Sequence, residues 1–144
     1  MEKEFVPYEL AVKLKSFGFK ETCFGRWFFR ADFHRLNEEE FRTITSNYFD
    51  LPEHYTLAPT FSQAFRWFRE NYNIQSSVKF SGSKNHYAFE IRFQKLANGE
   101  NPPIMVWHHL DSWLGLNLDL FSTYEEAELA CLTMLIEIVE SKSE

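Results

Sequence analysis

Hydrophobic positions recur at helical spacing in three segments of the chain, residues 7–18, 60–72 and 123–139. The first segment opens on Pro7, which suits the first turn of a helix because its missing N–H would be unpaired there. It closes on Gly18, which tolerates the left-handed conformation beyond a helix end. The pattern therefore predicts a helix between these two residues, with the next residue folding back onto its last turn.

The other two helical segments each begin with a capping box, in which a threonine hydroxyl and a side chain three residues later satisfy unpaired N–H groups. These boxes are Thr60-x-x-Gln63 and Thr123-x-x-Glu126. The earlier segment is amphipathic, whereas the later one is apolar around most of its circumference. We expect the last helix to be buried on several sides, either between a sheet and other elements or in a contact between two copies of the chain.

Alternation of apolar and polar residues predicts strands elsewhere in the chain. Two of the alternating runs flank a short turn that contains Gly82, which indicates a β-hairpin. The alternating runs are residues 26–33, 74–81, 87–94 and 114–120, and a short apolar run at 104–107 predicts a further strand.

The weakest pattern lies in residues 34–57. Three consecutive acids, Glu38 to Glu40, favour the start of a short helix, since negative charge stabilises the N-terminal end of a helix. Asn47 and Pro52 are typical of turns. We expect a short helix followed by irregular structure here.

The order of these elements predicts an α+β fold of two layers. We expect a mainly antiparallel sheet of about four to five strands, with three helices packed mostly on one face. At 144 residues the chain has the length of one domain, so residues 1–144 are predicted to form a single domain. An apolar run of about 18 residues, as a membrane span needs, is absent, and the first residues lack the pattern of a signal peptide. The protein is therefore predicted to be cytoplasmic.

The net charge of −6 arises at the C-terminal end of the chain. From Asp119 onward seven acids accompany a single base, Lys142. On the last predicted helix, the two polar residues between 129 and 139, Thr133 and Glu137, fall on one narrow stripe with Glu126 and Glu140. An acidic chain is repelled by phosphate backbones, so nucleic-acid binding is not expected. We interpret these acids as a solvated helix face.

Residues able to carry out chemistry do not form a recognisable motif. The histidines and cysteines have no metal-ligand spacing, and the adjacent His108 and His109 would point to opposite faces of a strand. Cys23 and Cys131 are better explained by packing than by nucleophilic attack. Glycine-rich phosphate loops and a G-x-S-x-G motif are absent. The sequence therefore predicts no catalytic residue, metal or cofactor.

Binding is better supported than catalysis. Arg26, Phe28 and Arg30 share the polar side of the first predicted strand, and Lys79 and Arg92 share the same kind of side on the hairpin. If these sides coincide, four bases line one sheet face that could hold an acidic partner or single-stranded nucleic acid. The alternative is a solvated face with charge pairs between strands.

Aromatic residues make up 18% of the chain, which provides a second kind of binding surface. Exposed Trp and Tyr together with Arg are typical of protein interfaces. A small enzyme or a nucleotide-binding protein would instead use an aromatic pocket with Arg66, Arg69 or His108, next to Trp107. We keep this as the alternative to a protein-binding role.

Two blocks of the chain are specific enough to compare with known families, together with residues 5–25. The blocks read Ala58-Pro59-Thr60-x-x-Gln63-Ala64-Phe65-x-Trp67-Phe68-Arg69-Glu70 and Thr123-Tyr124-Glu125-Glu126-Ala127-Glu128-Leu129-Ala130-Cys131-Leu132. In these segments the chain resembles a family of small uncharacterised proteins of phages, prophages and genomes of Bacteroidales gut bacteria. Residues 26–57 and 76–121 differ from that family in being longer and more aromatic.

The resemblance implies a cytoplasmic accessory role in a mobile element, and it brings no activity with it. The matching residues are mostly helix caps and buried faces, so the resemblance bears on the fold more than on a site. A chain this short, acidic and free of motifs acts more plausibly by occupying a surface than by turning over a substrate. We therefore predict a non-enzymatic module that binds a host or phage protein, with a homodimer through the last helix as a further option.

Overall fold

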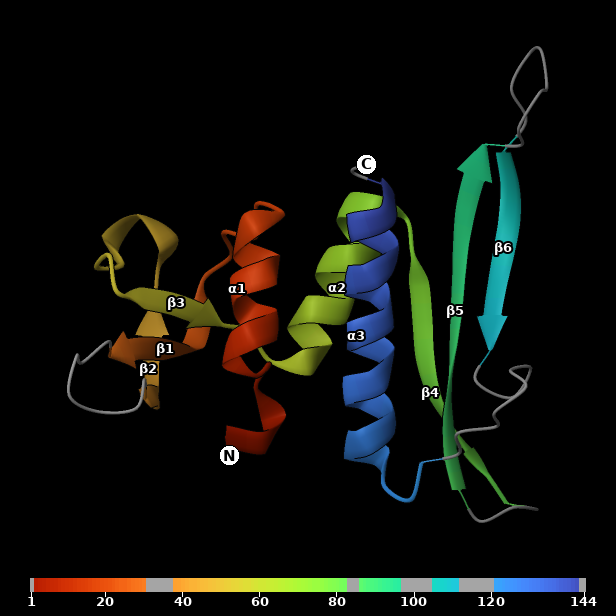
Figure 1. The fold of residues 1–144 in the computed structure, drawn as a ribbon, viewed down its shortest axis with the longest axis horizontal. Coiled ribbons are helices and arrows are strands. Elements are labelled where there is room, and N and C mark those ends of the chain that lie inside the picture. The colour runs from red at the N-terminus through yellow and green to blue at the C-terminus, as the bar shows by residue number, and fades with distance from the viewer. Residues whose placement is uncertain (1, 31–37, 83–85, 97–104, 112–120, 143–144) are drawn as a thin grey trace. The chain divides into compact units, whose positions relative to one another are not determined.

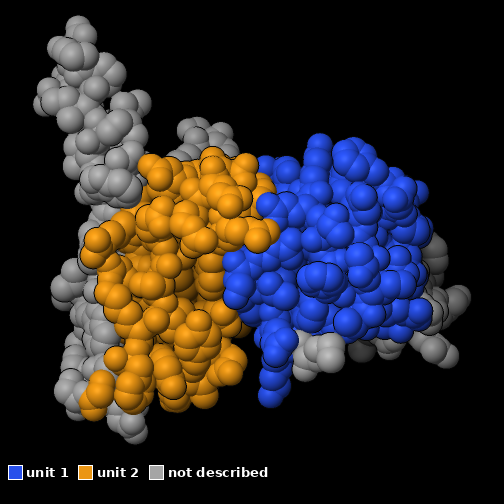
Figure 2. Space-filling view, turned by 180° about the vertical axis from the view of Figure 1, so that it is seen from behind, with its two compact units in different colours: residues 1–64 blue, residues 65–144 orange. Residues whose placement is uncertain are grey.

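The computed structural model describes residues 2–30, 38–82, 86–96, 105–111 and 121–142 (Figure 1). The chain forms two compact units, residues 1–64 and 65–144, which Figure 2 shows in different colours. The boundary between them falls within the helix α2 (Phe61–Tyr72). Each unit combines helix with antiparallel sheet, which confirms the α+β class. The single domain stays a prediction.

The described residues of the first unit form a 3-10 turn at Glu2–Glu4, the helix α1 (Tyr8–Ser16), a three-stranded sheet and the start of α2. The strands of this sheet are β1 (Cys23–Arg30), β2 (Glu38–Ser46) and β3 (Tyr55–Ala58). The sheet order is β2–β1–β3, and the central strand is antiparallel to both neighbours. The outer strands are therefore parallel, so the connection 47–54 has to run back along the sheet. This connection contains the 3-10 turn Tyr48–Asp50, and the Nζ atom of Lys20 lies 5.1 Å from the centre of the Tyr48 ring.

The end of α1 follows the predicted pattern. Gly18 has a φ of 96°, in the left-handed region that favours glycine. Its N–H donates to the carbonyl of Lys15 at 3.0 Å, and the N–H of Phe19 donates to the carbonyl of Leu14 at 3.0 Å. Phe19 is buried, so its ring folds back under the last turn as expected. At the other end Pro7 immediately precedes the helix instead of forming its first residue.

The strand β2 shows that the short helix predicted at Glu38 to Glu40 is wrong. These residues pair along β1, with Glu40 opposite Phe28. The next residue, Phe41, brings its ring to 4.8 Å from Phe5 and 5.2 Å from Trp27. Ladder hydrogen bonds and aromatic packing outweigh the local preference of acids for a helix start, because context dominates strand formation.

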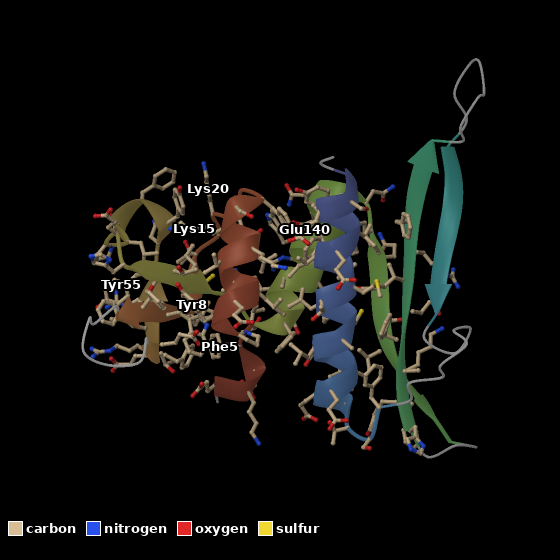
Figure 3. All side chains as sticks on the ribbon, viewed as in Figure 1. Phe5, Tyr8, Lys15, Lys20, Tyr55 and Glu140 are labelled. Carbon is tan, nitrogen blue, oxygen red and sulfur yellow. The ribbon has the colours of Figure 1, made fainter. Side chains whose placement is uncertain are left out.

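The side of the first sheet that carries Trp27 packs on the N-terminal segment. Trp27 donates its indole N–H to the carbonyl of Val6 at 2.9 Å, and Tyr8 (labelled in Figure 3) stacks on Phe29 with ring centres 5.5 Å apart. Gly25 of β1 allows the ring of Phe41 to lie close to the backbone, because a Cβ at position 25 would be only 2.8 Å from that ring. Aromatic contacts therefore dominate this core.

The second unit begins in α2 and contains a second three-stranded antiparallel sheet, of order β4–β5–β6. The strands of this sheet are β4 (Gln75–Ser81), β5 (His86–Leu96) and β6 (Met105–Asp111), and the helix α3 (Tyr124–Lys142) follows them in the chain. The first two strands confirm the hairpin, and the strand expected at 104–107 extends to Asp111. The helix α3 packs on β4 and β5. The strand predicted at 114–120 lies outside the described residues.

The prediction of one sheet with four to five strands is therefore wrong in its arrangement, since the strands of the described residues form two sheets of three. The strand β1 pairs with β2 and β3, whereas β4 and β6 pair with β5. The helices divide in the same way, because α1 contacts β3 and α3 contacts β4 and β5. Alternation marks strand residues, but it does not determine which strands share a ladder.

Each predicted capping box forms its threonine half, whereas the side chain three residues later bonds elsewhere than to the threonine N–H. The hydroxyl of Thr60 accepts from the N–H of Gln63 at 3.2 Å, but the Gln63 amide donates to Glu21 and to the Thr22 carbonyl instead of reaching back. At α3, the hydroxyl of Thr123 accepts from the Glu126 N–H at 3.2 Å. The Glu126 carboxylate accepts from the N–H of Ser122 at 3.1 Å. The sequence therefore located both helix starts.

Candidate functional site

The bases proposed to share one sheet face lie in two different sheets. Arg26 and Arg30 belong to β1 of the first sheet, whereas Lys79 and Arg92 belong to β4 and β5 of the second. A single sheet face that carries all four bases therefore does not form. The reason is strand pairing. The strand β1 pairs with β2 and β3, whereas the hairpin strands β4 and β5 pair with each other in the second sheet.

In the first sheet, an aromatic cluster surrounds Arg26. Its guanidinium carbon lies 4.3 Å from the centre of the Tyr55 ring, and the Phe28 ring lies 4.9 Å from the same ring. The Nε atom of Arg26 is buried and has no hydrogen-bond partner among the described residues. A cation over an aromatic ring is stabilised by the ring quadrupole. For Arg30, the structure describes only the backbone, which lies opposite Glu38.

Two exposed phenylalanines in this unit were missed in the sequence. Phe24 is 65% exposed and lies where the register of β1 shifts, so that two residues of β2, Ile44 and Thr45, face it. Phe49 is 82% exposed and lies in the 3-10 turn after β2. Alternation does not reveal such residues, because a bulge and a turn both interrupt the period of two. Single exposed apolar residues are common on protein surfaces, so neither phenylalanine by itself defines a site.

In the second sheet, Lys79 and Arg92 are held by a carboxylate between them. Glu90 is buried on β5, and its Oε2 accepts from the Nζ of Lys79 while its Oε1 accepts from the Nε of Arg92. The Lys79–Glu90 pair joins β4 to β5, as the alternative reading expected, whereas Arg92 and Glu90 pair within β5. A hollow of about 270 Å³ beside this cluster is lined by Gln75, Ser76, Ser77, Glu90 and Arg92. One carboxylate serves two cations, so much of their charge is already compensated.

The aromatic pocket proposed as the alternative is described only in part. Arg66 and Arg69 are exposed on α2, and the Nε of Arg66 lies 4.0 Å from the Oε1 of Glu70. Trp107 and His108 belong to β6, where the register places them opposite Gln94 and Phe93. Their side chains lie outside the described part of the structure. The pocket therefore stays a prediction.

An apolar concavity with a volume of about 450 Å³ lies on α3; we call it the α3 trough. It is lined by Phe121, Glu126, Leu129, Ala130, Thr133, Met134 and Glu137. The side chains that bury α3 are Ala127, Cys131, Leu132, Leu135, Ile136 and Val139. At about 100° per residue, these two sets fall on opposite sides of the helix. The trough is therefore on the side of α3 that faces away from its buried stripe.

The sequence contained a signal for this trough, but we interpreted it as a solvated face. The polar stripe was located correctly, because Glu126, Thr133 and Glu137 all line the trough. What the stripe did not show is that Leu129 and Met134 border it. Leu129 is 40% exposed, and Met134 is half-buried. A narrow polar stripe with apolar borders is thus a mixed surface rather than a purely solvated one.

Both cysteines are buried and poorly suited to nucleophilic chemistry. Burial raises the pKa of Cys23 to about 12, and the charge of Glu21 adds to the increase. Burial also raises the pKa of Cys131 to about 12, against a hydrogen bond from Ser76 that lowers it. A thiol with such a pKa is almost entirely protonated at neutral pH. Packing, as the sequence indicated, accounts for both residues.

Metal sites and membrane spans have no candidate in the part of the chain that the structure describes. There, no three His, Cys, Asp or Glu side chains are grouped so that they could hold a metal ion. None of the helices in the same residues is long and apolar enough to cross a membrane. Comparison of the chain with protein-family models, curated proteins and solved structures finds no match.

Proposed function

We propose that this protein is a non-enzymatic binding module that contacts another protein through the α3 trough. The observation that supports the proposal is the composition of the trough, which combines apolar side chains with a carboxylate at each end. Protein interfaces have the same anatomy, with an apolar centre inside a polar rim. The resemblance of the capping and buried segments supports a cytoplasmic accessory role in a phage or prophage.

The position of the trough on the helix also supports a binding role. A helix that only covers a sheet buries one stripe and presents charged residues at the centre of the opposite side. On α3, Glu126 and Glu137 lie at that centre toward its two ends, but between them the small residues Ala130 and Thr133 are flanked by Leu129 and Met134. Small side chains between larger ones create a depression into which a partner side chain can insert. Such insertion into a desolvated pocket provides much of the binding energy at protein interfaces.

The charge of α3 favours a different protein over a second copy of this chain. The helix carries five glutamates and one lysine. In a symmetric pair of antiparallel α3 helices, Glu126 of each copy would approach Glu137 of the other. Like charges brought together at an interface cost several kcal/mol. We therefore commit to a heterologous partner and treat the homodimer as an outcome of the test.

The test is site-specific photo-crosslinking of the full chain in cells that produce it. A photoreactive phenylalanine analogue replaces Leu129 in the trough. In the control protein it replaces Val12 on α1, an apolar residue of similar exposure (38% against 40%). We expect a discrete covalent adduct with another protein from position 129 and none from position 12. The same adducts from both positions, no adduct from either, or an adduct of twice the mass of the chain would overturn the proposal.

A further inference from the structure

The two carboxylates of the α3 trough are related by a helical spacing. Glu126 and Glu137 are eleven residues apart, which corresponds to about 16 Å along the axis and about 20° around it. They therefore lie almost on one line parallel to the helix axis, one at each end of the apolar depression. Both side chains are exposed. This geometry sets the distance at which a partner must present two positive charges.

The floor between the carboxylates is apolar even though it contains a threonine. The hydroxyl of Thr133 donates to the carbonyl of Leu129 at 2.8 Å, so its hydrogen-bonding requirement is met within α3. Thr133 therefore needs no hydrogen bond from a partner, and it lines the trough together with Ala130. Helices pack at axis separations of about 8–10 Å, and the shortest of these need small residues at the contact. The trough consequently suits the close approach of a second helix.

We propose that the α3 trough binds one amphipathic helix of a partner protein, with two Lys or Arg residues eleven positions apart. This inference rests on the proposed function and names the chemistry of the partner. Two helices packed nearly parallel or antiparallel have the same rise per residue, so a spacing of eleven on one matches eleven on the other. Apolar residues four and seven positions after the first base then lie over Ala130 and Thr133. An extended strand would need its bases four or six positions apart, about 13 or 20 Å, because only an even spacing places both on one face.

The carboxylates are available for these contacts. The Oε2 of Glu126 accepts from the N–H of Ser122, and a carboxylate has a second oxygen that accepts further hydrogen bonds. Glu137 lies in the interior of α3 and is exposed. Because both ends of the trough carry the same charge, the partner helix can run in either direction. The negative charge of α3 as a whole would also accelerate the encounter with a basic helix.

The test uses designed peptides of 18 residues with the full chain. The first peptide has Lys at positions 4 and 15 and Leu at positions 8 and 11, so that these four residues share one helical face. The second has Glu at the two Lys positions. The third is an extended, proline-flanked peptide with its lysines six positions apart, so that both lie on one face. Binding is measured by fluorescence anisotropy at low salt, and helicity of the first two peptides is checked by circular dichroism.

The wild-type chain should bind the lysine helix about tenfold more tightly than the glutamate helix, since attraction is replaced by repulsion at two exposed pairs. Glu137→Lys should weaken binding of the lysine helix about fivefold and strengthen binding of the glutamate helix. The matched control is Glu125→Lys, which makes the same change at an exposed residue of α3 outside the trough. It should change either affinity less than twofold. Circular dichroism and thermal melting show whether each variant is folded, and Glu137→Gln replaces Glu137→Lys if the latter is not.

Several results would overturn the inference. The first is equal affinity of the chain for the lysine helix and the glutamate helix. The second is an equal change in these affinities caused by Glu125→Lys and Glu137→Lys. The third is tighter binding of the extended peptide than of the lysine helix. If position 129 crosslinks to a protein but the lysine helix does not bind, the binding function stands and the proposed chemistry of the partner is wrong. If the lysine helix binds but position 129 gives no adduct with another protein, the proposed function fails instead.

Discussion

At the scale of the residue, Glu90 of the second sheet is a buried carboxylate. Its side chain is 8% exposed, whereas those of Lys79 and Arg92 are 47% and 59% exposed. A buried carboxylate is tolerated only when it is hydrogen-bonded and paired, because its transfer out of water is costly. The two exposed cations can turn toward solvent, but Glu90 cannot.

We expect Glu90→Gln to lower the free energy of unfolding by about 1–2 kcal/mol, because two charge-assisted hydrogen bonds lose their acceptor charge. The matched control is Glu40→Gln in the first sheet. Glu40 accepts from Arg42 at 3.1 Å, but both side chains are about half exposed, so the change should be within about 0.5 kcal/mol. Urea unfolding followed by circular dichroism measures both. Equal losses would show that burial of Glu90 is not what gives its ion pairs their importance.

The two cysteines lead to a second prediction at this scale. With a pKa of about 12, only about one thiol in ten thousand is ionised at pH 8. Cys23 and Cys131 should therefore react slowly with a disulfide reagent such as DTNB in the native protein, and both should react within minutes in urea. Release of the coloured thiolate measures the rates. Rapid stoichiometric reaction of one cysteine in the native state would contradict its burial.

At the scale of the element, the end of α1 depends on the conformation of one glycine. Gly18 and Gly82 both have open space around them, since nothing lies within 4 Å of a Cβ built at either. They differ in the backbone, because only Gly18 of these two has a φ in the left-handed region. Comparison of alanine substitutions at the two positions therefore isolates the conformational cost, since neither has a steric one.

Gly18→Ala should destabilise the protein by about 1 kcal/mol, because alanine is strained at this φ. Gly82→Ala lacks that strain, and it should be neutral or slightly stabilising because it restricts the unfolded chain. Chemical unfolding of the two variants beside the wild type provides the comparison. A neutral Gly18→Ala would mean that the end of α1 adopts another conformation in solution.

Comparison of the predicted helices and strands with the observed ones indicates which parts of this fold the sequence predicts. The helix starts at Thr60 and Thr123 were predictable because capping is a contact over three residues. The strand at Glu38 was not, because its ladder partner Arg30 is eight residues away and the packing of Phe41 involves Phe5, which is distant in the chain. Local signals therefore identified the helices and the hairpin, whereas the strand that depends on distant contacts was mistaken for a helix.

At the scale of the whole molecule, the candidate surfaces depend on which strands pair. Because β1 and the hairpin belong to separate sheets, Arg26 stacks on Tyr55 whereas Lys79 and Arg92 bind Glu90. The predicted four-base face is thus replaced by two local clusters. The α3 trough follows from the same level of organisation, because packing of α3 on β4 and β5 determines which of its sides remains exposed.

The sequence by itself determined the α+β class, the three helices with their caps, the hairpin and the burial of both cysteines. Each of these depends on side-chain periodicity or on hydrogen bonds within a few residues, and such interactions are visible in a linear pattern. Only the tertiary structure decided the division into two sheets, the strand at Glu38 and the apolar borders of the α3 trough. These features arise when residues distant in the chain compete for the same neighbours, and the outcome depends on the packing energy of the whole arrangement.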